Sequence, residues 1–167
     1  PDPTVSATGC TVLQALTQAL PSEDETVLAA FSHNLSGVLP SAADAVDAVA
    51  DGSCYVGVAT EDLALQAADN GFSVTVVYPT EGTVIQPDCA AVVQGCLHED
   101  NARAFIDFLL SDEVQTRLTR QSRRAVRGQA AASAALPRAM AYDAYAAGAR
   151  QAELLAIWQS LTAEAAS

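Results

Sequence analysis

Residues 54–78 read CYVGVATEDLALQAADNGFSVTVVY, and this stretch decides the expected fold. It opens with a short apolar run, Cys54–Ala59, and closes with Ser73–Tyr78, which is rich in β-branched residues and bounded by a glycine and a proline. Between them, Thr60–Ala68 has helical spacing and carries two carboxylates in its first turn, where the helix dipole favours negative charge. The stretch therefore predicts a β-α-β unit.

Signals for helices and strands alternate on both sides of this stretch. Upstream, helices are expected over Cys10–Leu20, from the Ser22-x-x-Glu25 capping box to Leu35, and from Ser41-x-x-Asp44 to Ala50. Downstream, we expect a strand over Cys89–Val93, helices over Asp100–Leu110 and from Ser111, a polar connection over Arg123–Ala135, and a helix over Pro137–Ala163. Because strands alternate with helices, the expected fold class is α/β, with a mostly parallel sheet flanked by helices.

Length and composition limit the class of protein. A chain of 167 residues suits one domain with a sizeable core. Half of the residues are apolar, yet no uncharged apolar run approaches the roughly 18 residues that a membrane-spanning helix needs. The composition therefore argues against a disordered chain and against a transmembrane helix.

The charge is distributed unevenly along the chain. Residues 1–100 hold 14 carboxylates and no Lys or Arg, whereas residues 101–167 hold 6 carboxylates and all 8 basic residues. The net charge of −12 repels nucleic acids, which proteins bind mainly through Lys and Arg contacts to phosphates. We therefore expect no nucleic-acid partner.

Four cysteines leave the redox state open. An even number fits either disulfides in an oxidising compartment or buried free thiols. If residues 90–94 are an extended strand, Cys89 and Cys96 lie roughly 20 Å apart, too far for a disulfide unless the chain bends between them. There is no C-x-x-C motif and no histidine at zinc-finger spacing, so no structural zinc is expected. We also expect no cofactor.

Several motifs together resemble a family of binding proteins. They are Pro1-Asp2-Pro3 with Ser6-x-Thr8-Gly9, Asp51-Gly52 with Tyr55 and Val58, Val76-Val77-Tyr78-Pro79-x-Glu81-Gly82-Thr83, and the arginines of residues 123–127. The most specific is NARAFIDFLLSDEVQ over residues 101–115. The chain resembles the type 2 periplasmic solute-binding proteins of ABC importers, and is most similar to the branch that binds iron(III), phosphonates, polyamines or thiamine.

This resemblance implies a place for the chain in a larger, two-lobed protein. Residues 1–82 would be the core of the second lobe, and residues 83–167 the returning strand, helices and C-terminal helical tail of the same ligand-binding lobe. A missing first lobe and an ABC permease would be its partners. Its location would be extracytoplasmic, either in the periplasm or as a lipoprotein at the cell surface. A chain with one lobe is expected to bind its solute weakly, because the other half of the contacts is absent.

The first candidate binding group is Ser6, Ala7, Thr8 and Gly9 at the start of a helix. Free backbone N–H groups and two hydroxyls there can bind an anion without a cationic side chain. In the resembled family this position faces the ligand cleft. The alternative is that Ser6 or Thr8 simply caps the helix.

The second candidate group consists of acidic and aromatic side chains. Glu61 and Asp62 can pair with a ligand amine, ligate a metal through oxygen, or only stabilise the start of their helix. The adjacent tyrosines that commonly hold iron(III) in the family are absent from this segment. Tyr78 and Glu81 flank the expected crossover between lobes, so they either line the cleft or fix the hinge.

Other chemistries are weaker alternatives. The arginines between 117 and 127 can recognise phosphate, although a solvated face or pairing with the acidic part of the chain is the more ordinary use. Cys10 at a helix N-terminus permits a thiol-enzyme hypothesis, but no histidine in the local motif supports it, so we expect no enzyme. A sensory ectodomain of a signalling receptor is the alternative use of the same fold; the complete reading frame would distinguish it.

The ligand is expected to carry both charges. No Lys or Arg precedes Arg103, so an anionic group at Ser6–Gly9 relies on backbone N–H groups and hydroxyls. A free dianion would also meet the carboxylates of Glu61 and Asp62. These features favour a zwitterionic, aminophosphonate-like solute first, and a metal–anion pair second.

Overall fold

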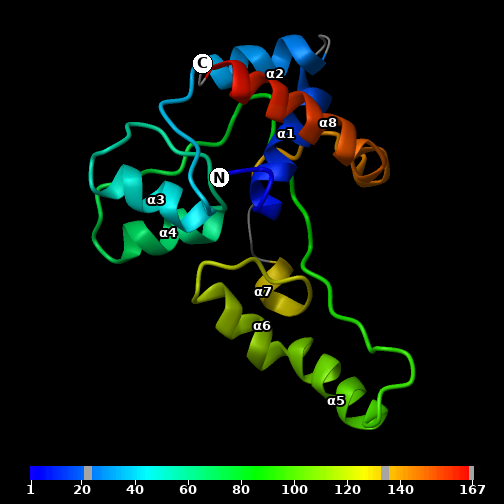
Figure 1. Cartoon of the computed structure of the whole chain (residues 1–167). Coiled ribbons are helices and arrows are strands. Elements are labelled where there is room, and N and C mark those ends of the chain that lie inside the picture. The colour runs from blue at the N-terminus through cyan, green and yellow to red at the C-terminus, as the bar shows by residue number, and fades with distance from the viewer. Residues whose placement is uncertain (21–23, 133–135, 166–167) are drawn as a thin grey trace. The chain divides into compact units, whose positions relative to one another are not determined.

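The computed structural model of the chain describes residues 1–20, 24–132 and 136–165. In chain order the helices are α1 (Ala7–Ala19), α2 (Asp24–His33), α3 (Ala42–Ala50), α4 (Glu61–Asp69), α5 (Glu99–Leu109), α6 (Asp112–Thr119), α7 (Gly128–Ala132) and α8 (Ala144–Ala165), all labelled in Figure 1. The chain divides into a first unit, Pro1–Val84 with Pro137–Ser167, and a second unit, Ile85–Leu136.

The expected α/β fold with a parallel sheet is wrong. Within the described residues there is no strand, and the only β-type pairing is an isolated parallel bridge between Thr83 and Ala139. The runs expected as strands, Cys54–Ala59, Ser73–Tyr78 and Cys89–Val93, are not helical and form no ladder. The physical reason is that β-branched and apolar residues favour an extended backbone locally, whereas a strand also needs a partner backbone from elsewhere in the chain.

The side chains of these runs remain in contact with solvent. Tyr55 is 100% exposed, Val56 is 84% exposed and Val77 is 82% exposed. Large apolar side chains that would lie between a sheet and its helices are therefore not buried. In the structure, burial comes from contacts between helices.

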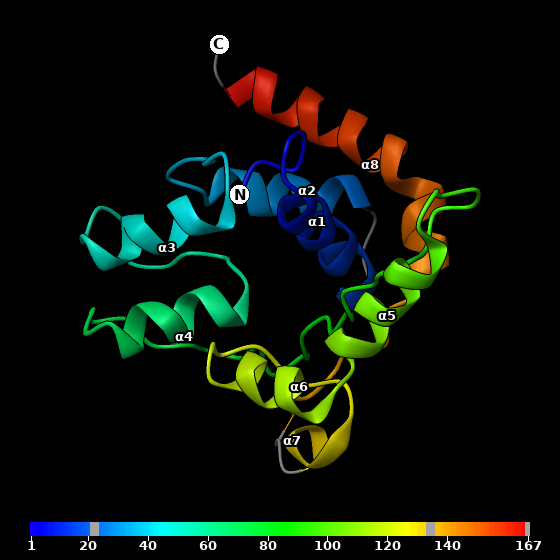
Figure 2. The same cartoon turned by 90° about the horizontal axis from the view of Figure 1, so that it is seen from below.

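The core of the first unit lies between α1, α2 and α8, which pack side by side in both Figure 1 and Figure 2. Its buried members are Leu13 on α1, Leu28 on α2, and Leu154 and Trp158 on α8, of which Leu13 and Leu28 are fully buried. The ring of Phe31 lies 6.2 Å from that of Trp158, at a tilted angle of 41°, which is a favourable aromatic geometry. The C-terminal helix is thereby packed against the first two helices of the chain.

A helical pair, α3 and α4, completes the first unit, and the two lie side by side in both views. The helix start expected at Ser41-x-x-Asp44 is confirmed, and the structure shows that it is a capping box: the Asp44 amide donates to Ser41 Oγ at 3.2 Å, and the Ser41 amide donates to Asp44 Oδ2 at 2.9 Å. Gly57 follows in the extended segment, where a Cβ atom would lie 2.9 Å from the Ala45 carbonyl oxygen. A glycine is therefore needed where this segment crosses α3.

The predicted helices agree with the structure, apart from their ends and one addition. α1, α2, α4, α5 and α6 form where they were expected, although the box at Ser22 lies outside the described residues. α8 begins at Ala144 rather than at Pro137, and α7 interrupts the expected polar connection. The reason for the late start of α8 is that Asp143 Oδ1 accepts the amides of Tyr145 and Ala146, which makes Asp143 the helix cap.

The second unit is held by a buried glutamine. Gln115 on α6 donates from Nε2 to the Leu109 carbonyl oxygen at 2.9 Å and accepts the Val126 amide at 2.8 Å, joining the end of α5 to the segment after α6. In the expected α/β fold, a helix such as α5 would bury its apolar face against the sheet. Instead, Phe105 and Phe108 are 59% and 53% exposed, because the sheet is not formed.

The helical core makes a direct prediction. Replacing the fully buried Leu28 by Ala should lower the free energy of unfolding by about 2–5 kcal/mol, because it removes buried methyl groups and leaves a cavity. Urea denaturation followed by circular dichroism measures this. The control Val56→Ala, at an exposed position, should change stability by less than about 0.5 kcal/mol. Equal effects of the two substitutions would contradict the described core.

Candidate functional site

The start of α1 is capped by its own serine. Ser6 has an extended backbone, and its Oγ accepts the Gly9 amide at 3.4 Å. The Ser6 carbonyl oxygen accepts the Cys10 amide at 3.0 Å as the helix begins. Capping is therefore the role that the structure shows for Ser6. Ala7 and Thr8 form the first turn beside it, with Ala7 exposed and Thr8 half-buried.

The turn before α1 packs on the buried Gly9. A Cβ atom at Gly9 would lie 2.5 Å from the Pro1 carbonyl oxygen and 2.7 Å from backbone atoms of the next two residues. The Asp2 amide donates to the Leu39 carbonyl oxygen at 2.6 Å, which ties this turn to the segment before α3. Asp2 Oδ1 also accepts the Thr4 amide at 2.8 Å. Gly9 is therefore required for close packing of the N-terminal segment on α1.

Two predicted site residues meet at the start of α4. Glu61 lies in the first turn of α4 and is half-buried, and the Tyr78 hydroxyl donates a hydrogen bond to its Oε1. Asp62 follows in the same turn and is also half-buried. The extended segment that ends at Tyr78 thus brings a phenol to a carboxylate at the N-terminus of a helix, where the dipole favours negative charge.

Glu81 lies just beyond Tyr78, in the turn that leads to the bridge at Thr83. Its Oε2 accepts a hydrogen bond from Thr80 Oγ1 at 3.0 Å. The pKa of Glu81 lies below its ordinary value because its own backbone amide, the Thr80 hydroxyl and the positive charge of Arg138 all favour the carboxylate. Glu81 is therefore an exposed, ionised carboxylate at neutral pH.

The structure groups the predicted residues in two places within the first unit. Ser6 to Gly9 form the start of α1, whereas Glu61, Tyr78 and Glu81 are brought together by the Tyr78 hydrogen bond and by their turn. Sequence reasoning missed Arg138, whose Nη1 donates to the Thr80 carbonyl oxygen at 2.6 Å. The sequence carried no clear signal for it, because Arg138 becomes one of only two arginines in an acidic unit only when the structure joins residues 1–84 to residues 137–167.

A groove of about 270 Å³ lies between α1 and the start of α8. Two of its polar lining residues, Gln14 and Gln18, are engaged in fastening α1 to the start of α8. Gln14 donates to the Ala147 carbonyl oxygen at 3.2 Å and accepts from the Tyr142 hydroxyl at 2.7 Å. Gln18 pairs with both the amide and the carbonyl oxygen of Asp143, at 2.8 and 3.1 Å. This groove therefore has a structural role.

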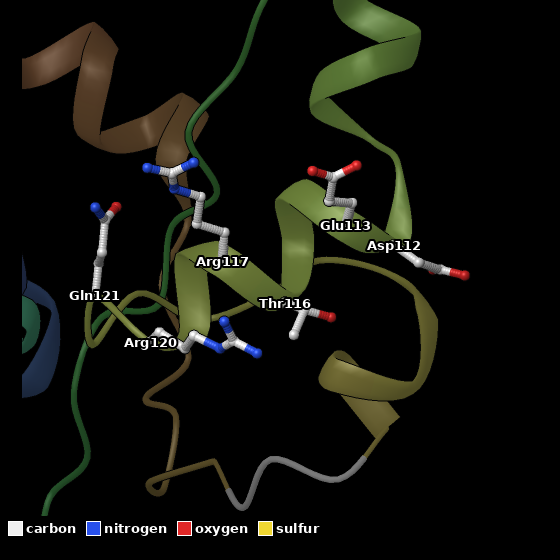
Figure 3. Close-up of a pocket in the computed structure, with 6 residues that line it drawn as sticks. All are labelled: Asp112, Glu113, Thr116, Arg117, Arg120 and Gln121. Carbon is white, nitrogen blue, oxygen red and sulfur yellow. The ribbon is translucent and has the colours of Figure 1, made fainter.

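The second unit carries an open hollow of about 710 Å³ along α6, shown in Figure 3. Glu113 and Arg117 project from one side of the helix, and Thr116 and Arg120 project from another. The two guanidinium groups point in different directions and do not converge on one ligand position. Arg123, from the same arginine-rich segment, forms an ion pair with Asp88. These arrangements support the solvated and paired uses of the arginines over phosphate recognition.

The cysteines are free thiols of unequal exposure. Cys10 is half-buried in α1, and burial raises the pKa of its thiol above the ordinary value. Because the thiolate is the reactive form, a raised pKa reduces the reactivity of Cys10 at neutral pH. Cys89 is exposed.

No group of three or more His, Cys, Asp or Glu side chains is arranged to hold a metal ion in the part of the chain that the structure describes. In the same residues, no helix combines the length and the apolar character needed to cross a membrane.

Comparison with known proteins gives the class. A family model described as bacterial extracellular solute-binding protein matches residues 1–146. The chain therefore belongs to this family of bacterial extracellular solute-binding proteins. No curated protein and no solved structure matches the chain. The general expectation of an extracytoplasmic solute-binding protein is confirmed.

The cap at α1 can be tested by one substitution. Ser6→Ala should lower the free energy of unfolding by about 1 kcal/mol, because the Gly9 amide loses its acceptor. Thr8→Ala is the control, since the Thr8 hydroxyl takes no part in this cap. Thermal unfolding followed by circular dichroism compares the two variants. A larger loss of stability for Thr8→Ala than for Ser6→Ala would contradict the assignment of Ser6 as the helix cap.

The thiols should react in the order of their exposure. Cys89 is expected to react with a disulfide reagent such as DTNB faster than Cys10 at neutral pH, because Cys10 is partly buried and its pKa is raised. Mass spectrometry of peptides from a partly labelled sample identifies the modified residue. Selective fast labelling of Cys10 would instead revive the thiol-enzyme hypothesis.

Proposed function

We propose that the protein is the solute receptor of an ABC importer, which captures a small polar solute outside the cytoplasm and delivers it to a membrane permease. The family match over residues 1–146 is the observation that carries this proposal. A receptor of this kind binds its ligand without chemical change, so the proposed role is binding rather than catalysis. The raised pKa of the Cys10 thiol fits this role.

The proposed contacts come from the two groups described above. The start of α1 contributes Ser6, Ala7, Thr8 and Gly9, and the second group contributes Glu61, Asp62, Tyr78 and Glu81. At α1, the backbone N–H groups of Ala7 and Thr8 and the Thr8 hydroxyl suit an anionic group of the solute, while the buried Gly9, whose amide donates to Ser6 Oγ, shapes the turn beside them. In the second group, carboxylates suit a cationic group, and the Tyr78 hydroxyl orients Glu61.

The electrostatics of the first unit favour a solute with both charges. Residues 1–84 and 137–167 hold 14 of the 20 carboxylates and two arginines. A plain dianion would be repelled by this excess of negative charge, whereas an ammonium group would be attracted. We therefore propose a zwitterionic, aminophosphonate-like solute first and a metal–anion pair second.

Binding measurements with a small panel test the proposal. The protein expressed from the complete reading frame that encodes this chain is titrated by calorimetry with phosphate, 2-aminoethylphosphonate, spermidine and ferric citrate. We expect 2-aminoethylphosphonate to bind tightest. Glu61→Gln should weaken its binding by about ten- to a hundredfold, because a charge-assisted hydrogen bond contributes roughly 1.5–3 kcal/mol.

A matched control separates the site from a general charge effect. Glu99→Gln removes the same charge from an exposed pair with Arg103 in the second unit, and should leave the affinity unchanged. The proposed charge pairing is wrong if plain phosphate binds best and Glu61→Gln leaves every affinity as it was. Tightest binding of ferric citrate would select the metal–anion alternative.

A further inference from the structure

Two chain segments meet beside the turn that runs from Pro79 to Thr83. The Thr83 amide donates to the Arg138 carbonyl oxygen at 2.9 Å, and the Met140 amide donates to the Thr83 carbonyl oxygen at 3.0 Å. This short parallel pairing joins residues on either side of the second unit, which the chain enters after Val84 and leaves before Pro137. Both connections to the second unit therefore start from one paired point in the first unit.

A glycine allows the two segments to come this close. Gly82 is buried with φ +111°, and a Cβ atom there would lie 2.8 Å from the Met140 amide nitrogen. Its own amide donates to the Pro79 carbonyl oxygen at 3.1 Å, which closes the turn. The backbone from Pro79 to Thr83 thus has a defined shape that a side chain at Gly82 would disrupt.

Arg138 contacts this turn at two separate points. Its carbonyl oxygen holds the Thr83 amide, and its Nη1 donates to the Thr80 carbonyl oxygen at 2.6 Å. Between these points lies Glu81, whose Oε2 accepts a hydrogen bond from the Thr80 hydroxyl at 3.0 Å. The arginine therefore spans the turn from residue 80 to residue 83.

Arg138 is one of only two basic residues in the first unit. Residues 1–84 and 137–167 contain only one other arginine and no lysine. That other arginine, Arg150, forms ion pairs with Asp24 and Glu153 at α8. The nearby positive charge of Arg138 also contributes to the lowered pKa of Glu81, after the Glu81 amide and the Thr80 hydroxyl.

We propose that Arg138 is the positioning residue of the turn from Pro79 to Thr83, and that by holding this turn it keeps Glu81 and the preceding Tyr78 in the arrangement in which they meet the solute. We call the two contacts of Arg138 with the turn the clamp. The effect of the clamp on solute binding rests on the proposed function, whereas the clamp itself does not. Arginine suits this role because its fixed, planar guanidinium directs an N–H donor at a carbonyl oxygen, while lysine offers only a flexible point charge.

The clamp is tested without any solute, by NMR on the labelled chain. Arg138→Gln should raise the pKa of Glu81 towards its ordinary value, because a favourable positive charge is removed. It should also speed hydrogen exchange at the Thr83 and Met140 amides by about three- to tenfold, because the turn opens more often. Arg138→Lys should keep the pKa of Glu81 low and yet speed exchange.

The control is Arg103→Gln, which removes an arginine from an exposed pair with Glu99 in the second unit. It should change neither the Glu81 titration nor the exchange of the two amides. If Arg138→Gln also leaves both quantities unchanged, the clamp is refuted. A uniform loss of protection throughout the first unit would likewise refute it, because the effect would then be general destabilisation.

Calorimetry with 2-aminoethylphosphonate then tests the link to the solute. Arg138→Gln should weaken binding by about three- to tenfold in the protein from the complete reading frame. If the turn responds in the NMR experiments but the affinity does not, the positioning role is overturned, while the proposed function remains tested separately through Glu61. If no panel compound binds to the unsubstituted protein, the proposed solute class fails, and the amide exchange still decides the clamp.

Discussion

The packing of α8 against α1 and α2 is the contact on which the first unit depends. Leu154 and Trp158 bury their side chains against Leu13 and Leu28, which lie more than a hundred residues earlier in the chain. Closing so long a loop costs conformational entropy, which the burial of these large apolar side chains offsets. Because α8 is held there, the segment before it, with Arg138, is brought beside the turn at Glu81.

Polar contacts give this apolar packing a defined register. Gln14 and Gln18, one helical turn apart on α1, bond to the backbone at the start of α8, and Arg150 on α8 pairs with Asp24 at the start of α2. Apolar contacts alone would tolerate some sliding of one helix along another. Directional hydrogen bonds at fixed backbone positions remove that freedom, and so place residues 137–140 accurately.

The division into units also separates charge. The second unit holds six carboxylates and six arginines, so the whole net charge of −12 belongs to the first unit. A charge of this size repels anions and attracts cations over the surface of the unit that carries Glu61, Asp62 and Glu81. Arg138 introduces a positive charge beside Glu81, so this part of the unit carries charges of both signs.

The sequence by itself determined the helices, including the helix start at Ser41-x-x-Asp44, and the family, because helical hydrogen bonds and caps are made within a few residues and the matching motifs are linear. It also indicated Glu61 and Tyr78, but not the hydrogen bond between them. Tertiary structure alone decided that Ser73–Tyr78 forms no sheet, that α8 covers α1, and that Arg138 reaches Thr80. Each of these depends on a partner distant in the chain, which no local pattern of residues specifies.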